Sequence, residues 1–115
     1  MGNSLAVLRE FPQTVREEIG FALYLAQSGG KHPNAKPLKG LGSGILEVVS
    51  DFRGDTYRAV YTVRLTGKLY VLHAFQKKSK KGVATPRFEI ELVRQRLKRA
   101  IELHSGEENS HGQEA

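Results

Sequence analysis

The sequence predicts a single α+β domain, because helix-forming stretches at both ends of the chain enclose three strand-like runs joined by short turns. Its 115 residues are enough for one modest hydrophobic core. We expect the domain to span residues 1–104, as an N-terminal helical hairpin, an antiparallel β-meander and a C-terminal helix. One layer of helices would then cover one layer of sheet. Residues 105–115 are polar and acidic, which predicts a disordered tail.

Apolar residues recur at helical spacing in two neighbouring stretches near the N-terminus, 5–11 and 15–26. Pro12 suits the first turn of the second helix, and Gly29 suits its end. Gly20 lies inside this second helix, where a glycine costs about 1 kcal/mol relative to alanine. Its presence there suggests that another part of the chain packs closely against it.

The middle of the chain carries the strand-like runs. Residues 30–44 are rich in glycine, proline and lysine, a composition typical of a loop. Runs rich in β-branched and aromatic residues then follow at 44–52, 56–65 and 68–76. Only the short turns RGD and TG separate these runs, and short connections favour antiparallel pairing.

A last helix is predicted after the strands. Thr85 and Pro86 are typical of an N-cap followed by a first-turn residue. Apolar residues continue at helical spacing to about Leu103, and basic residues occupy much of the remaining helix surface.

The net charge of the chain indicates the class of partner that it attracts. It has 18 Lys and Arg residues against 12 Asp and Glu residues, a formal net charge of +6. Without the three glutamates of the tail the remainder carries +9, and a basic domain of this size attracts polyanions such as nucleic acids. No apolar run approaches the roughly 20 residues needed to span a bilayer, so we expect no membrane partner.

The composition also argues against several kinds of site. The chain has no cysteine, which excludes disulfides and thiolate metal sites and favours a reducing cytoplasm. Its four histidines have no metal-ligand spacing, and no phosphate-binding loop motif is present. We therefore expect neither a metal nor a cofactor.

Basic residues gather where the strands end. A lysine cluster is often only a solvated surface, but basic segments that converge on one edge favour a groove for phosphates. The lysines concerned are Lys36, Lys39, Lys77, Lys78, Lys80 and Lys81.

Two further residues stand out inside the strands. Alternation places Arg58 on the same face as Val60, where an arginine is costly unless it is paired. Arg58 either forms a salt bridge with Glu47 or Asp51, or contacts a phosphate. His73 is either a packed, hydrogen-bonded histidine or an acid–base group, since its usual pKa lies near neutrality.

Three segments together resemble a known family: AKPLKGLGSGILEV, FRGDTYRAVYTV and YVLHAFQKKSKKGVATP. In this order, after a helical hairpin, they are similar to the phage-related HigB-like branch of the RelE/ParE toxin superfamily. The resemblance covers about residues 5–103. It implies a RelE-like fold and a type II toxin that cuts mRNA on the ribosome without a metal. It also implies a cognate helix-turn-helix antitoxin as partner.

The resemblance also assigns roles to individual residues. Arg58 matches the strand arginine that contacts the scissile phosphate in RelE-like enzymes, and Arg53 matches a basic position at the preceding turn. Preorganised Arg and Lys side chains can stabilise the negative charge that develops when the ribose 2′-hydroxyl attacks the phosphate. The expected catalytic residues are Arg58, Lys77, Lys78 and His73, and the expected RNA-binding residues are Lys36, Lys39, Arg53, Lys80 and Lys81.

Two other functions remain open at this level. A ParE-like protein would inhibit DNA gyrase by binding it, without nuclease activity. A nucleic-acid-binding domain without catalysis would also use a basic surface. The lysine run together with Arg58 favours the nuclease, because a gyrase inhibitor needs no cluster that stabilises a phosphate.

Overall fold

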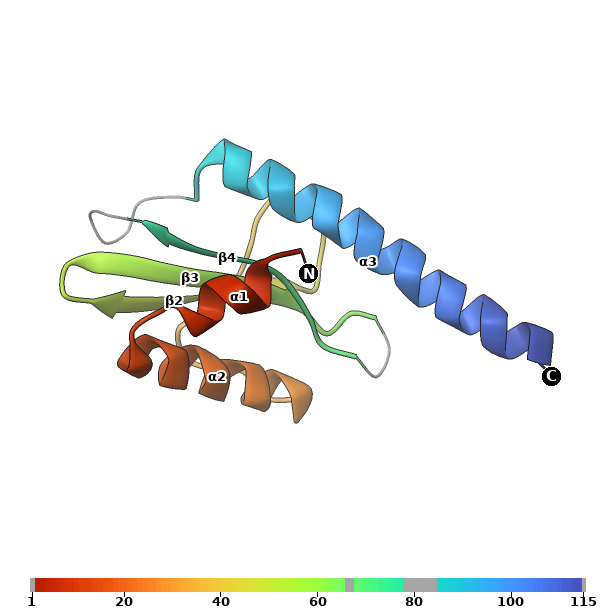
Figure 1. Cartoon of the computed structure of the whole chain (residues 1–115), viewed down its shortest axis with the longest axis horizontal. Helices are drawn as coiled ribbons and strands as arrows, with labels where there is room; N and C mark the ends of the chain where they lie inside the picture. The colour runs from red at the N-terminus through yellow and green to blue at the C-terminus, as the bar shows by residue number, and fades with distance from the viewer. Residues whose placement is uncertain (1, 66–67, 78–84, 115) are drawn as a thin grey trace.

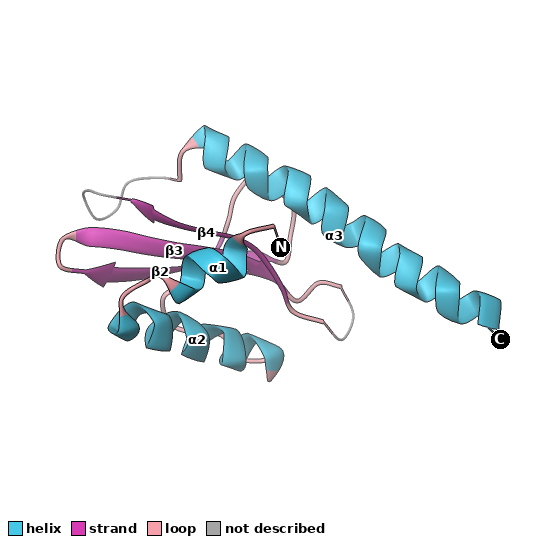
Figure 2. Cartoon of the chain, in the orientation of Figure 1, coloured by secondary structure: helices cyan, strands magenta, loops and turns pink. Residues whose placement is uncertain are grey.

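The computed structural model describes residues 2–65, 68–77 and 85–114, with side chains described through residue 105. Its order of elements confirms the α+β fold (Figures 1 and 2). The elements are α1 (Ser4–Arg9), α2 (Gln13–Gln27), β1 (Ala35–Pro37), β2 (Ile45–Phe52), β3 (Asp55–Thr62), β4 (Tyr70–Lys77) and α3 (Arg87–Glu114). The helical hairpin, the antiparallel sheet and the C-terminal helix are consistent with a RelE-like fold.

The sheet has four strands in the order β1-β2-β3-β4, and each neighbouring pair is antiparallel. The sequence predicted three strands, because β1 lies in a stretch whose glycines, prolines and lysines indicate a loop. β1 is only three residues long and pairs with β2 through Ala35 and Val48, both of which are buried. A strand this short has too few residues to show alternation.

Helices cover both faces of the sheet, so the expected single layer of helices is wrong (Figure 1). On one face, α1 and α2 pack against Tyr57, Ala59 and Tyr61 of β3. On the opposite face, α3 packs against Val60 of β3. All residues from Thr56 to Thr62 are buried. A strand that is covered on both faces has no solvent-exposed polar face. This explains why the run is rich in β-branched and aromatic residues.

The pairing of β3 with β4 contains an irregularity between Val60 and Tyr61. Val60 pairs with His73 and Tyr61 pairs with Val71, so Leu72 is an additional residue on β4. Leu72 packs in the core under α3, as Val60 does, although simple alternation would turn it to the other face. Beyond the bulge, His73 pairs with Val60 and Phe75 pairs with Arg58, so both lie on the α3 face.

The apolar stripe of α2 is buried as predicted, through Val15, Ile19, Ala22 and Ala26. The interpretation of Gly20 was wrong. A Cβ built on Gly20 would meet no heavy atom within 4 Å, so nothing in the described chain packs closely there.

The C-terminal helix differs from the prediction at both ends. α3 begins at Arg87, and the Pro86 carbonyl accepts the first helical hydrogen bonds from Glu89 and Ile90, so Pro86 takes the cap position expected for Thr85. At the other end α3 continues to Glu114 and protrudes from the body of the domain (Figure 1). Residues 105–114 of the predicted disordered tail are thus helical, and each residue added to an existing helix gains one hydrogen bond. No helix in the described chain is long and apolar enough to cross a membrane.

Candidate active site

Arg58 lies in the middle of β3, on the face of the sheet that α3 covers only in part. The residue is 5% exposed, although a charged side chain is costly to bury without a partner. Its partner is Glu47 of β2, which is 7% exposed. Arg58 Nη1 lies 3.1 Å from Glu47 Oε1, so the salt bridge that the sequence offered as one alternative is present.

Thr85 closes this pair into a triangle. Its hydroxyl donates to Glu47 Oε2 over 2.8 Å and accepts from Arg58 Nη1 over 3.1 Å. The three side chains come from β2, β3 and the residue pair that leads into α3, so the triangle joins three separate segments. Both oxygens of Glu47 accept a hydrogen bond within it, and such partners are the condition for burying a charged pair.

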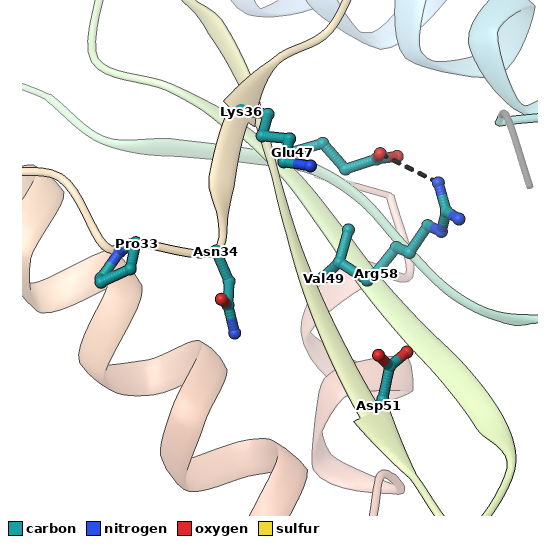
Figure 3. Close-up of a pocket in the computed structure, with 7 residues that line it drawn as sticks. All are labelled: Pro33, Asn34, Lys36, Glu47, Val49, Asp51 and Arg58. Carbon is teal, nitrogen blue, oxygen red and sulfur yellow. Dashed lines mark hydrogen bonds and ion pairs between the residues drawn. The ribbon is translucent and has the colours of Figure 1, made fainter. Parts of the chain in front are cut away.

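A pocket of about 370 Å³ opens beside this pair (Figure 3). Glu47, Val49 and Asp51 line it from alternate positions of β2, and Arg58 lines it from β3. Its remaining walls are Pro33, Asn34 and Lys36, from β1 and the segment before it.

The sheet brings further basic residues to the same face. Lys36 is the cross-strand partner of Glu47 and lines the pocket. Lys77, at the end of β4, pairs with Thr56, two residues before Arg58 on β3. Since cross-strand partners share a face and residues two apart on a strand do too, Lys36, Arg58 and Lys77 lie on one side of the sheet.

His73 lies on this face but is engaged through both ring nitrogens. Its Nε2 lies 2.8 Å from Glu89 Oε1, and its Nδ1 lies 2.9 Å from Arg96 Nη1. Arginine can only donate, so Nδ1 accepts and the ring proton sits on Nε2, which donates to Glu89. The ring also stacks on Phe75, with centroids 5.1 Å apart. This environment favours the packed histidine, because proton transfer would require one of these contacts to break.

Arg96 connects this histidine to the N-terminus. It donates to the Leu72 carbonyl and to the side chains of Ser4 and Asn3, besides His73. Burial lowers the pKa of the Arg96 guanidinium below its ordinary value, and the carboxylate of Glu89 partly opposes this shift. The network holds α1 and α3 together at the β4 edge of the sheet.

The other predicted RNA-binding residues lie further out. Lys39 is exposed and lines a second pocket, of about 480 Å³, together with Thr85, Arg87 and Arg94. Arg53 is exposed at the turn between β2 and β3, with a φ of 52° that non-glycine residues rarely adopt. Its guanidinium lies 5.1 Å from the centre of the Phe52 ring. Lys78, Lys80 and Lys81 lie outside the described residues.

The sequence did not identify every residue of this site. Glu47 was considered only as a partner for Arg58, and Thr85 only as a helix cap. One signal could have indicated a shared site. Glu47 occupies a position that faces the sheet core, on the strand next to the one that carries Arg58. No signal indicated Thr85, because its contacts span 38 and 27 residues of sequence.

Comparison with known proteins identifies the family. No curated protein and no solved structure matches this chain. A family model described as "Phage derived protein Gp49-like" matches residues 6–98, a range that includes every element from α2 to β4 and the whole of the pocket. The chain therefore belongs to the Gp49-like family of phage-derived proteins, and with it to the RelE/toxin-like proteins in general.

Proposed function

We propose that this protein is the toxin of a type II toxin–antitoxin pair, of the HigB-like kind, and that it halts translation by cutting mRNA on the ribosome. The observation that carries the proposal is the buried Arg58–Glu47 pair at a pocket that shares its face of the sheet with Lys36 and Lys77. A carboxylate beside several cations is the set of groups that cleavage by a 2′-hydroxyl requires.

In the proposed reaction Glu47 is the general base. Its carboxylate accepts the proton of the ribose 2′-hydroxyl, and the 2′-oxygen attacks the adjacent phosphorus. The new bond joins the 2′-oxygen to phosphorus, and the bond from phosphorus to the 5′-oxygen breaks. The Lys77 ammonium donates a proton to the leaving 5′-oxygen. The products are a 2′,3′-cyclic phosphate and a 5′-hydroxyl end.

Arg58 stabilises the charge that develops on the phosphorane. Its guanidinium presents N–H donors on more than one edge, so it can hold a carboxylate and bind a phosphate oxygen at once. Because Glu47 and Thr85 already fix its orientation, little reorganisation is needed when the charge develops. Lys36, Lys39, Arg53, Lys80 and Lys81 would attract the RNA backbone, and Lys78 stays a second candidate for the role of Lys77. His73 was expected to be catalytic, but in this proposal it is a structural support.

The partner and the location follow from the same proposal. A cognate antitoxin with a helix-turn-helix domain would neutralise the toxin, and both would act in the cytoplasm. Induction of this chain alone should then arrest growth, and co-expression of the antitoxin should relieve the arrest.

The test removes the catalytic pair without leaving a buried charge. Arg58→Met combined with Glu47→Leu replaces both partners by apolar groups, a change that buried ion pairs often tolerate. Primer extension on ribosome-bound mRNA should show cleavage reduced by about 100-fold or more. Circular dichroism and the melting temperature should stay close to those of the wild type.

A second pair of variants tests the lysine. Lys77→Met should lower the cleavage rate by a similar factor, whereas Lys98→Met removes an exposed lysine of α3 and serves as the matched control. Wild-type rates for both the double variant and Lys77→Met would show that the proposed cluster is not catalytic. If protein synthesis continued while DNA supercoiling failed, the ParE-like function would replace this one.

A further inference from the structure

Thr85 has contacts that helix formation does not explain. A threonine before a proline at the start of a helix usually caps the helix with its side chain. Here Pro86 is the cap residue, and the Thr85 hydroxyl instead points at Glu47 and Arg58.

The direction of these hydrogen bonds is fixed by chemistry. A guanidinium only donates and a carboxylate only accepts, so the single hydroxyl proton of Thr85 goes to Glu47 Oε2. The Thr85 oxygen then receives a proton of Arg58 Nη1. The same Nη1 also meets Glu47 Oε1. The Thr85 hydroxyl therefore bridges the two charged groups, because it donates to one and accepts from the other.

Arginine and carboxylate groups often pair through two parallel hydrogen bonds, with both oxygens held by the guanidinium. In this structure the hydroxyl of Thr85 holds the second oxygen of Glu47. Each oxygen of the Glu47 carboxylate thus accepts from a different residue. A residue outside the ion pair, Thr85, sets the orientation of the carboxylate.

We infer that Thr85 is a positioning residue for the active site, a role that rests on the proposed function. Its hydroxyl keeps Glu47 from turning both oxygens onto Arg58. Glu47 then stays oriented as a base towards the pocket, beside Arg58. Thr85 itself touches neither the ribose nor the scissile phosphate.

Three variants separate this role from a general loss of stability. Thr85→Val keeps the shape of the side chain and removes the hydroxyl, and Thr85→Ser restores the hydroxyl. Thr62→Val is the matched control, because Thr62 is a buried threonine of β3 whose hydroxyl donates to the Gly44 carbonyl over 2.7 Å.

Cleavage of ribosome-bound mRNA should be measured over a range of ribosome concentrations. For Thr85→Val we expect kcat to fall by about 10- to 100-fold, with KM nearly unchanged, because the reacting groups are misplaced while binding persists. Thr85→Ser should recover most of the rate. Thr62→Val should lower the melting temperature and leave kcat near the wild-type value. A Thr85→Val protein that cleaves as fast as the wild type would overturn the inference.

A crystal structure of Thr85→Val tests the same inference without any reference to activity. We expect Glu47 Oε2 to turn onto Arg58 and form the second hydrogen bond of a bidentate pair. A Glu47 that keeps its wild-type orientation would overturn the positioning role. If the wild-type protein cuts no RNA but Oε2 turns in the variant, the proposed function fails and the control of Glu47 by Thr85 is supported.

Discussion

Tyr61 is a fully buried residue of β3 whose hydroxyl has no hydrogen-bond partner among the described residues. A buried polar group without a partner loses its hydration and gains nothing in return. We expect Tyr61→Phe to raise the free energy of unfolding by about 1 kcal/mol, as measured by urea denaturation. Tyr24→Phe is the control, because Tyr24 is 63% exposed and its hydroxyl is hydrated in both states. A Tyr61→Phe protein that is less stable than the wild type would show that this hydroxyl is satisfied in solution.

The same tyrosine predicts a pH dependence. Burial raises the pKa of Tyr61 above its ordinary value of 10.0, because the charged phenolate is poorly solvated in the core. Between pH 10.0 and the raised pKa the unfolded chain releases this proton and the folded chain keeps it, so stability falls as the pH rises. The loss is about 1.4 kcal/mol per pH unit for a single group. Tyr61→Phe should lose less stability than the wild type over this range.

At the scale of single residues, the sequence predicted one contact of the candidate site. Arg58 was identified because a charged residue in a strand of apolar neighbours needs a partner, and Glu47 was one of the partners named. The sequence indicated neither the base role that we propose for Glu47 nor its hydrogen bond from Thr85. A hydrogen bond between residues on separate elements depends on how those elements pack, and this information is absent from local sequence patterns.

At the scale of elements, α2 contains a glycine that the fold does not need. A Cβ at Gly20 would have open space around it, and its backbone is helical with no positive φ. We therefore expect Gly20→Ala to raise the free energy of unfolding by about 1 kcal/mol, from helix propensity alone. The melting temperature should rise by about 4 °C.

Gly54 provides the contrast for this test. It has a φ of 86° in the turn between β2 and β3, a conformation that strains any residue with a side chain. Gly54→Ala should therefore destabilise the protein. Destabilisation by Gly20→Ala as well would show that the flank of α2 is more crowded in solution than in this structure.

The elements that the sequence predicted well are those with a clear period. α2 and the strands β2, β3 and β4 have either a helical stripe or a long run of β-branched and aromatic residues. β1 was missed because three residues cannot show a period. The placement of α3 on the opposite face of the sheet was also missed, since a helical stripe shows which side of a helix is buried and not which face of the sheet receives it.

At the scale of the whole molecule, positive charge is concentrated in the body of the domain and negative charge in the end of α3. Residues 105–115 carry three glutamates and no basic residue other than histidine. They contain no large apolar residue, so burial can contribute little to their docking on the domain. Their negative charge is nevertheless opposite in sign to that of the rest of the chain, because the net charge changes from +6 to +9 when they are removed.

Deletion of residues 105–115 should therefore change RNA affinity more than stability. We expect the melting temperature to change little, and the affinity for a single-stranded RNA oligonucleotide to rise at low salt. Because salt screens the repulsion between the acidic segment and the RNA, the gain in affinity should shrink as salt rises, so log K should fall more steeply with log salt than it does for the full chain. Replacing the three glutamates by glutamine is the matched control, because it removes the charge and keeps the length. An unchanged affinity at low salt after deletion would show that the acidic segment does not oppose RNA binding. A loss of more than about 2 kcal/mol of stability would mean that it is part of the folded domain.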